Sequence, residues 1–118
     1  MEPNLIQFMV DFTMPQELSD EFVSLIPSQR ATVNQLLNEG KILTYALSLE
    51  NSKVWAVFSV SSRDELNEII DSMPLSGYMK MRVSELTFYN AAHPFTPAPS
   101  QYRYPGHATW PPTVYLLR

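Results

Sequence analysis

The stretch SRDELNEIIDSMPLSGYMKMRV, residues 62–83, decides the fold of this chain. Ser62 is placed to accept a hydrogen bond from the N–H of Glu65, and Glu65 to reach back to the backbone of Ser62, so the stretch begins as a helix with a capping box. Pro74 ends this helix, because it has no N–H and disfavours helical geometry in the residue before it. Gly77 then predicts a turn that leads into a strand. The apolar face of the helix consists of residues at three- and four-residue spacing, namely Leu66, Ile69, Ile70 and Met73.

Working outward, the rest of the N-terminal region reads as alternating strands and helices. Residues 15–39 are typical of a helix that starts near Pro15, kinks or divides at Pro27, and stops at Gly40. Asn51-Ser52 predicts a tight hairpin turn. Period-two patterns predict strands at residues 4–13, 41–50, 53–60 and 78–89. The order βαββαβ predicts an α+β, ferredoxin-like fold, with one four-stranded antiparallel sheet and both helices on one face.

The composition changes at residue 90. Residues 90–112 hold six of the ten prolines together with several aromatic side chains, and this combination favours extended chain over helix or central strand. We therefore expect two parts. Residues 1–89 form the folded domain, and residues 90–118 form a Pro/aromatic-rich tail that packs on its own subunit or on a neighbour.

Composition excludes several classes of function. A chain of 118 residues with 45% hydrophobic and 17% charged residues predicts one folded domain. A net charge of −4 with scattered basic residues argues against nucleic acid as a partner. No cysteine is present, and no apolar run approaches the ~20 residues needed to span a bilayer. We expect a cytoplasmic protein that has no membrane partner and needs no cofactor.

The most specific pattern is the turn SMPLSGYMKMRV at residues 72–83, which comes with Gly40-Lys41 at the start of the second strand. With the βαββαβ order, it resembles the muconolactone isomerase family of the dimeric α+β barrel group, over roughly residues 5–88. The resemblance implies a homodimer in which two sheets face each other, often built into a larger ring. It also implies an isomerase of aromatic catabolism that moves a proton within a small unsaturated lactone acid without a cofactor.

Polar side chains on one face of the predicted sheet are the candidate site. Gln7 and Asp11 lie on the mixed face of the first strand, and Lys80 and Arg82 lie opposite the methionines of the fourth. Because these strands run antiparallel as neighbours, Asp11 is expected close to Lys80 or Arg82. If this cluster is an active site, Lys80 and Arg82 bind a substrate carboxylate, and Asp11 transfers the proton. Gln7 then contributes to substrate binding. If the cluster has only a structural role, Asp11 forms a cross-strand ion pair with Lys80 or Arg82 at a dimer interface.

Aromatic side chains and histidines offer weaker candidates. Tyr45, Trp55 and Tyr78 are either the lining of a pocket for a planar ligand or part of the core or interface. His93 and His107 lie in the tail without the spacing of metal ligands, so we expect no metal site.

Three functions remain open at this point. The first is an isomerase that acts on a cyclic, carboxylate-bearing small molecule by proton transfer. The second is a noncatalytic oligomeric module that binds a small ligand or serves assembly. It is favoured by the second predicted strand, because residues 42–47 carry no ionisable side chain except that of Tyr45. The third is a metal-free barrel monooxygenase that acts on aromatic substrates.

Overall fold

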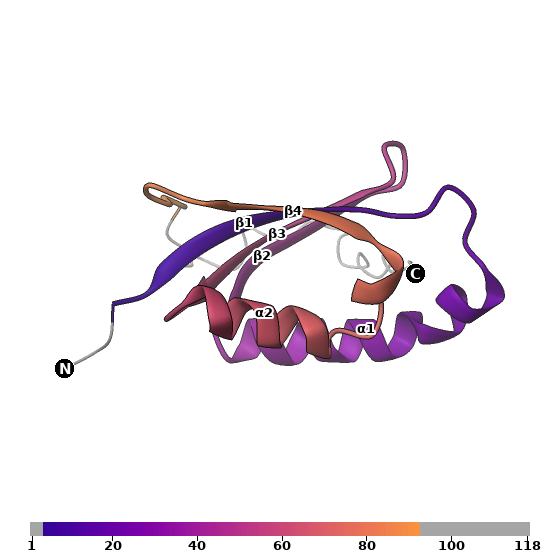
Figure 1. Ribbon diagram of the computed structural model, residues 1–118, viewed down its shortest axis with the longest axis horizontal. Helices are drawn as coiled ribbons and strands as arrows, with labels where there is room; N and C mark the ends of the chain where they lie inside the picture. Colours follow the sequence, from indigo (N-terminus) through magenta and orange to yellow (C-terminus); the bar gives the residue numbers. More distant parts are fainter. Residues whose placement is uncertain (1–3, 93–118) are drawn as a thin grey trace, which may run out of the picture.

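The computed structural model describes residues 4–92 of the chain. Figure 1 shows one sheet, with α1 and α2 lying along the same side of it. The elements, in chain order, are β1 (Ile6–Thr13), α1 (Asp20–Asn38), β2 (Ile42–Ser48), β3 (Lys53–Val60), α2 (Arg63–Ser72), the short 3-10 helix η1 (Ser76–Tyr78) and β4 (Lys80–Glu85). The predicted ferredoxin-like α+β fold is confirmed. The predictions for residues 93–118, including both histidines and the packing of the tail, lie outside the described residues.

The sheet has one face that packs against the helices and forms the core, and one face that the helices leave uncovered. The strand order is β2-β3-β1-β4, and each neighbouring pair is antiparallel. Phe8, Val10 and Phe12 of β1 alternate toward the helices and are buried. They pack with the apolar residues of β3 and of both helices in one core cluster. The intervening residues of β1 therefore point to the face that neither helix covers, called the open face below.

Helix α2 forms where the sequence predicts it, with one difference at its cap. The Ser62 hydroxyl accepts the N–H of Glu65 at 3.1 Å, as predicted. The Glu65 carboxylate, however, accepts from the N–H of Ser61 at 2.7 Å and from the Ser61 hydroxyl at 2.9 Å, rather than from the backbone of Ser62. Its second oxygen forms an ion pair with Lys41, which precedes β2. This carboxylate thus joins the start of α2 to the start of β2.

These contacts make the stability of the fold depend on pH. Hydrogen bonding to Lys41 and then to Ser61 lowers the pKa of Glu65 from 4.5 to about 2. Because the folded protein favours the ionised form, the stabilisation is present above pH 4.5 and is lost as the pH falls toward about 2. We expect Glu65→Gln to lose less free energy of unfolding over this interval than the wild type, as measured by urea denaturation at a series of pH values. Glu68→Gln, which changes an exposed carboxylate of the same helix, is the control and should follow the wild type. Identical profiles for all three proteins would contradict the assignment.

Helix α1 differs from its prediction at the beginning and at Pro27. It starts at Asp20 rather than near residue 15, because the Ser19 hydroxyl accepts the N–H of Phe22 at 3.0 Å and so caps the helix there. Pro27 lies inside a single continuous helix of 19 residues, so of the two outcomes predicted there, a kink or a division, the division into two helices is wrong. At the other end the helix stops as predicted, since Gly40 has the positive φ of 78° that glycine tolerates best.

The connections around β2 and β4 are longer than predicted. Ser48 pairs directly with Lys53, so a four-residue loop, residues 49–52, replaces the two-residue turn. The Ser48 hydroxyl accepts the N–H of Asn51 at 3.2 Å, and Ser52 takes a φ of 55°. These local contacts stabilise the wider loop. Strand β4 begins two residues later and ends four residues earlier than predicted, because η1 occupies the turn before it.

Candidate functional site

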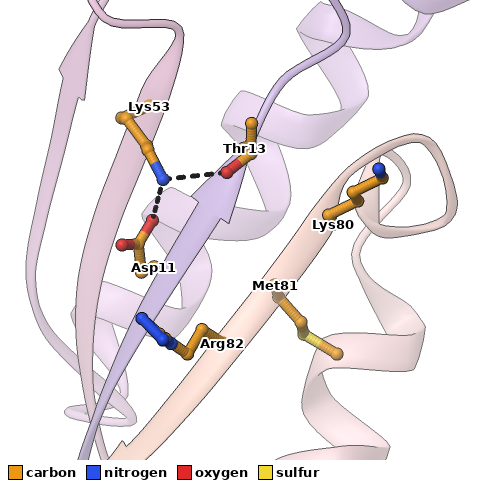
Figure 2. Close-up of a pocket in the computed structure, with 6 residues that line it drawn as sticks. All are labelled: Asp11, Thr13, Lys53, Lys80, Met81 and Arg82. Atoms are coloured by element: carbon orange, nitrogen blue, oxygen red, sulfur yellow. Dashed lines mark hydrogen bonds and ion pairs between the residues drawn. The ribbon is translucent and has the colours of Figure 1, made fainter.

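A polar cluster lies on the open face, where β1 ends and β3 and β4 begin. The register places Asp11 opposite Arg82, and Thr13 opposite both Lys53 and Lys80. These side chains come from three neighbouring strands and surround a cavity of about 240 Å³ (Figure 2). The cavity is lined by Asp11, Thr13, Lys53, Lys80, Met81 and Arg82. The expected juxtaposition of Asp11 with the β4 cations is therefore present.

The ion pair in this cluster is not the predicted one. Lys53 Nζ donates to Asp11 Oδ1 at 3.0 Å and to Thr13 Oγ1 at 2.9 Å, as the dashed lines in Figure 2 show. The prediction that Asp11 pairs with Lys80 or Arg82 is thus wrong. The reason is the central position of β3, whose first residue faces Thr13 and reaches diagonally to Asp11. The Asp11 and Lys53 side chains remain 29% and 32% exposed, so a ligand in the cavity can reach both.

Lys53 is the residue that sequence reasoning missed. It stands at the start of a strand, next to the hairpin, and carries no motif. A usable signal exists, however, in the fold itself. In the βαββαβ order β3 lies antiparallel to β1, so the first residue of β3 must lie beside the last residue of β1. Side chains alternate between the two faces of a strand, and Val54 points into the core, so Lys53 lies on the open face.

Gln7 shares the open face but not the cavity. Its side-chain amide donates to the Ser59 hydroxyl at 3.0 Å, and the two residues are paired across β1 and β3. Four residues of extended chain separate Gln7 from Asp11, which is about 13 Å. The structure therefore places this predicted substrate-binding residue toward the other end of the sheet.

The three aromatic candidates do not lie on one surface. Tyr45 pairs with Ala56 and Ala46 pairs with Trp55, so the alternation of the strands sends the two aromatic rings to opposite faces. Trp55 is on the open face, directly opposite Asp11. The pocket predicted for a planar ligand is therefore divided between the two sides of the sheet.

Tyr45 and Tyr78 belong to the helix side of the sheet. The Tyr45 hydroxyl accepts from Gln29 Nε2 at 3.3 Å, and burial raises the pKa of Tyr45 above its ordinary value. Gln29 is itself buried, and its carbonyl oxygen accepts the N–H of Leu75 at 2.9 Å. Tyr78 packs edge-on against Phe22 with ring centroids 5.9 Å apart. Tyr45 thus joins β2 to α1, and Tyr78 joins η1 to α1.

The charge balance of the cavity is opposite to that of the whole chain. The protein carries a net charge of −4, but the cavity has three cationic side chains and one carboxylate. Within residues 4–92, neither Lys80 nor Arg82 forms an ion pair, and both are exposed. The cavity is therefore suited to an anion, which would lie beside a carboxylate held in place by Lys53.

Two further observations concern the part of the chain that the structure describes. Over residues 4–92, no three His, Cys, Asp or Glu side chains converge in the manner of metal ligands. Neither of its α-helices has the length and apolar character needed to cross a bilayer.

A solved structure with the same architecture is the crystal structure of muconolactone isomerase. It superposes on this chain with a TM-score of 0.61 and 21% sequence identity, and the match covers 73% of this chain and 93% of that one. At this identity the likeness shows a shared fold. The search of curated proteins found no match.

The sequence itself supplies the family. Residues 6–92 match the muconolactone delta-isomerase family, which spans every helix and strand described above. The match covers well over half of the 118 residues. The chain therefore belongs to the muconolactone delta-isomerase family.

Proposed function

We propose that this protein is a cofactor-independent isomerase that moves a proton within a small cyclic substrate bearing a carboxylate. The observation that carries the proposal is the cavity on the open face, where one carboxylate, Asp11, lies among three cations. Family membership supports the reaction type. The cavity supports the substrate class, because small anions are bound by clustered Lys and Arg side chains.

The arrangement suggests a role for each side chain. Arg82 binds the substrate carboxylate, to which its planar guanidinium is able to make two parallel hydrogen bonds, and Lys80 adds a second positive charge at the rim of the cavity. Asp11 removes a proton from a carbon next to a carbonyl group, and the electron pair moves onto the carbonyl oxygen. The protonated Asp11 then returns the proton to a different carbon, so the composition of the substrate is unchanged. Lys53 orients Asp11 through the 3.0 Å contact and stabilises the negative charge that develops beside it.

Replacing Arg82 tests the binding half of this proposal. Arg82→Ala is expected to abolish measurable binding of small carboxylates, such as acetate and the monoamide of adipate, in titration calorimetry. Arg30→Ala is the matched control, because it removes an exposed arginine from α1, on the other side of the sheet. Ser59→Ala, toward the far end of β3, should also bind normally. Equal losses in all three variants, or no binding by the wild type, would contradict the site.

One observation favours a second function, a noncatalytic oligomeric module that binds a small ligand or serves assembly. The open-face positions of β2 that the pairing defines, Thr44, Ala46 and Ser48, carry no ionisable group. Among residues 4–92, Asp11 is then the only carboxylate that lines the cavity, and it is already engaged by Lys53. Ligand binding that depends on Arg82, without proton exchange in any bound lactone, would identify this second function.

We also propose that two copies associate through the open face. Met9 and Trp55 are half-buried there, and Leu5 is 54% exposed, so the face is more apolar than a surface that stays in water. A second sheet would cover these side chains and exclude water from the cavity, which strengthens its electrostatic interactions.

Light scattering tests the association. The wild type is expected to have at least the mass of a dimer at micromolar concentration. Met9→Lys places a charge at the centre of the open face and should yield a monomer that keeps the circular dichroism of the wild type. Val23→Lys, on the exposed side of α1, should leave the mass unchanged. A monomeric wild type would overturn the proposal.

A further inference from the structure

The cations of the cavity outnumber its carboxylate by two. Lys53 is engaged by Asp11, so the excess resides on Lys80 and Arg82. Both belong to β4, and they are two residues apart on the same face. Within the described residues no acidic side chain pairs with either of them. The cavity therefore presents two separate positive charges.

The strand sets the distance between the points from which these two side chains start. Alternate residues of a β-strand are about 6–7 Å apart along the chain, so the Cα atoms of Lys80 and Arg82 are separated by about this distance. Figure 2 shows Arg82 reaching across β1 toward Asp11, whereas Lys80 lies nearer the beginning of β4. The two cations therefore occupy different parts of the rim and are directed away from a common point.

This separation has a chemical consequence for the ligand. The two oxygens of a single carboxylate are matched by the guanidinium of Arg82 alone. Lys80 would then remain uncompensated beside a bound anion. A molecule with a second anionic group, several bonds away from the first, would engage both side chains. The cavity, at about 240 Å³, is smaller than the usual range for drug-sized ligands, which limits such a molecule to a few carbon atoms.

We infer that this site prefers a small dianion, in particular a dicarboxylate, with one carboxylate on Arg82 and the other on Lys80. The inference rests on the proposed function, whose substrate it narrows to a cyclic compound that carries two carboxylates. Lys80 is then the residue that determines specificity. It does not take part in the proton transfer, which belongs to Asp11.

A matched pair of ligands tests the inference on the full chain. Adipate has two carboxylates, and its monoamide has the same length with one carboxylate replaced by a neutral amide. Titration calorimetry at low ionic strength is expected to show that the wild type binds adipate about three- to tenfold more tightly than the monoamide. Lys80→Gln should remove this difference by weakening adipate alone. Arg30→Gln, on α1, should preserve it.

The outcomes separate this inference from the proposed function. Equal affinities of the wild type for the two acids would overturn the preference for a dianion. If Arg82→Ala still abolished both affinities, the carboxylate site itself would survive that result. A preference that persists in Lys80→Gln would also overturn the inference. The absence of binding by either acid would overturn both proposals.

Discussion

Asp11→Asn is expected to lower the turnover number of the proposed isomerisation by about 10²- to 10⁴-fold. An amide has nearly the shape of a carboxylate but does not take up a proton in the neutral pH range. The cations on β4 are unchanged by this substitution, so the Michaelis constant should move far less than the turnover number. The measurement is proton exchange: the reaction is run in deuterium oxide with small unsaturated lactones that carry one or two carboxylates, and deuterium incorporation into the lactone is followed by nuclear magnetic resonance.

Controls on the same chain make this result interpretable. Asp71→Asn changes an exposed carboxylate of α2, and this variant should incorporate deuterium into the lactone at the rate of the wild type. Lys53→Met removes the ion pair to Asp11 while keeping a side chain of similar length, and should slow exchange less than Asp11→Asn does. A rate for Asp11→Asn equal to that of the wild type, with ligand still bound, would remove Asp11 from the reaction. Another group would then have to move the proton.

Phe58→Ala is expected to lower the free energy of unfolding by about 3–5 kcal/mol, because it removes a large side chain from the centre of the core. Phe58 is 0% exposed in β3, and it lies between Phe8 of β1 and Ile42 of β2 in the register. Single domains are stable by only about 5–15 kcal/mol, so the loss would be a large part of the total. Urea denaturation followed by fluorescence measures it.

Phe88→Ala provides the comparison for this core substitution. Phe88 is 75% exposed and follows β4 near the end of the described residues. Its removal should change the free energy of unfolding by no more than about 0.5 kcal/mol. Equal losses in the two variants would mean that β3 is not the centre of the core.

The fold was predictable because its signals are local and repeat one another. The cap at Ser62, the apolar spacing of α2 and the stop before Pro74 all specify the same helix. Strand β3 occupies the residues that its alternation predicts. The beginning of α1 was not predictable from Pro15, because the hydroxyl of Ser19 competes for the same role and forms the hydrogen bond. Pro15 and Ser19 are both suitable residues for a helix start, and which of them is used depends on the path of the chain between β1 and α1.

The site was predictable where a single pair of strands determines it. Antiparallel pairing of β1 with β4 is sufficient to bring Asp11 to Arg82. The true partner of Asp11 is Lys53, 42 residues away in β3, and finding it requires the pairing of β1 with β3 to be considered together with that of β1 with β4. The prediction of an aromatic pocket was wrong for a related reason, because the pairing of β2 with β3 places Tyr45 and Trp55 on opposite faces of the sheet. Chemistry that requires three strands at once is visible only after the sheet is assembled.

Within residues 4–92, the order β2-β3-β1-β4 leaves two edge strands with an unpaired row of backbone groups, and these two strands are protected unequally. Strand β4 carries Lys80 and Arg82, and such charges discourage another chain from adding to the sheet. Strand β2 reads ILTYALS, without a charge or a proline, and its exposed side chains include Leu43 and Leu47. A segment of this length and composition is prone to cross-β aggregation. If the protein precipitates on storage or heating, β2 is therefore where aggregation should begin, and a lysine in place of Leu47 is where solubility engineering should start.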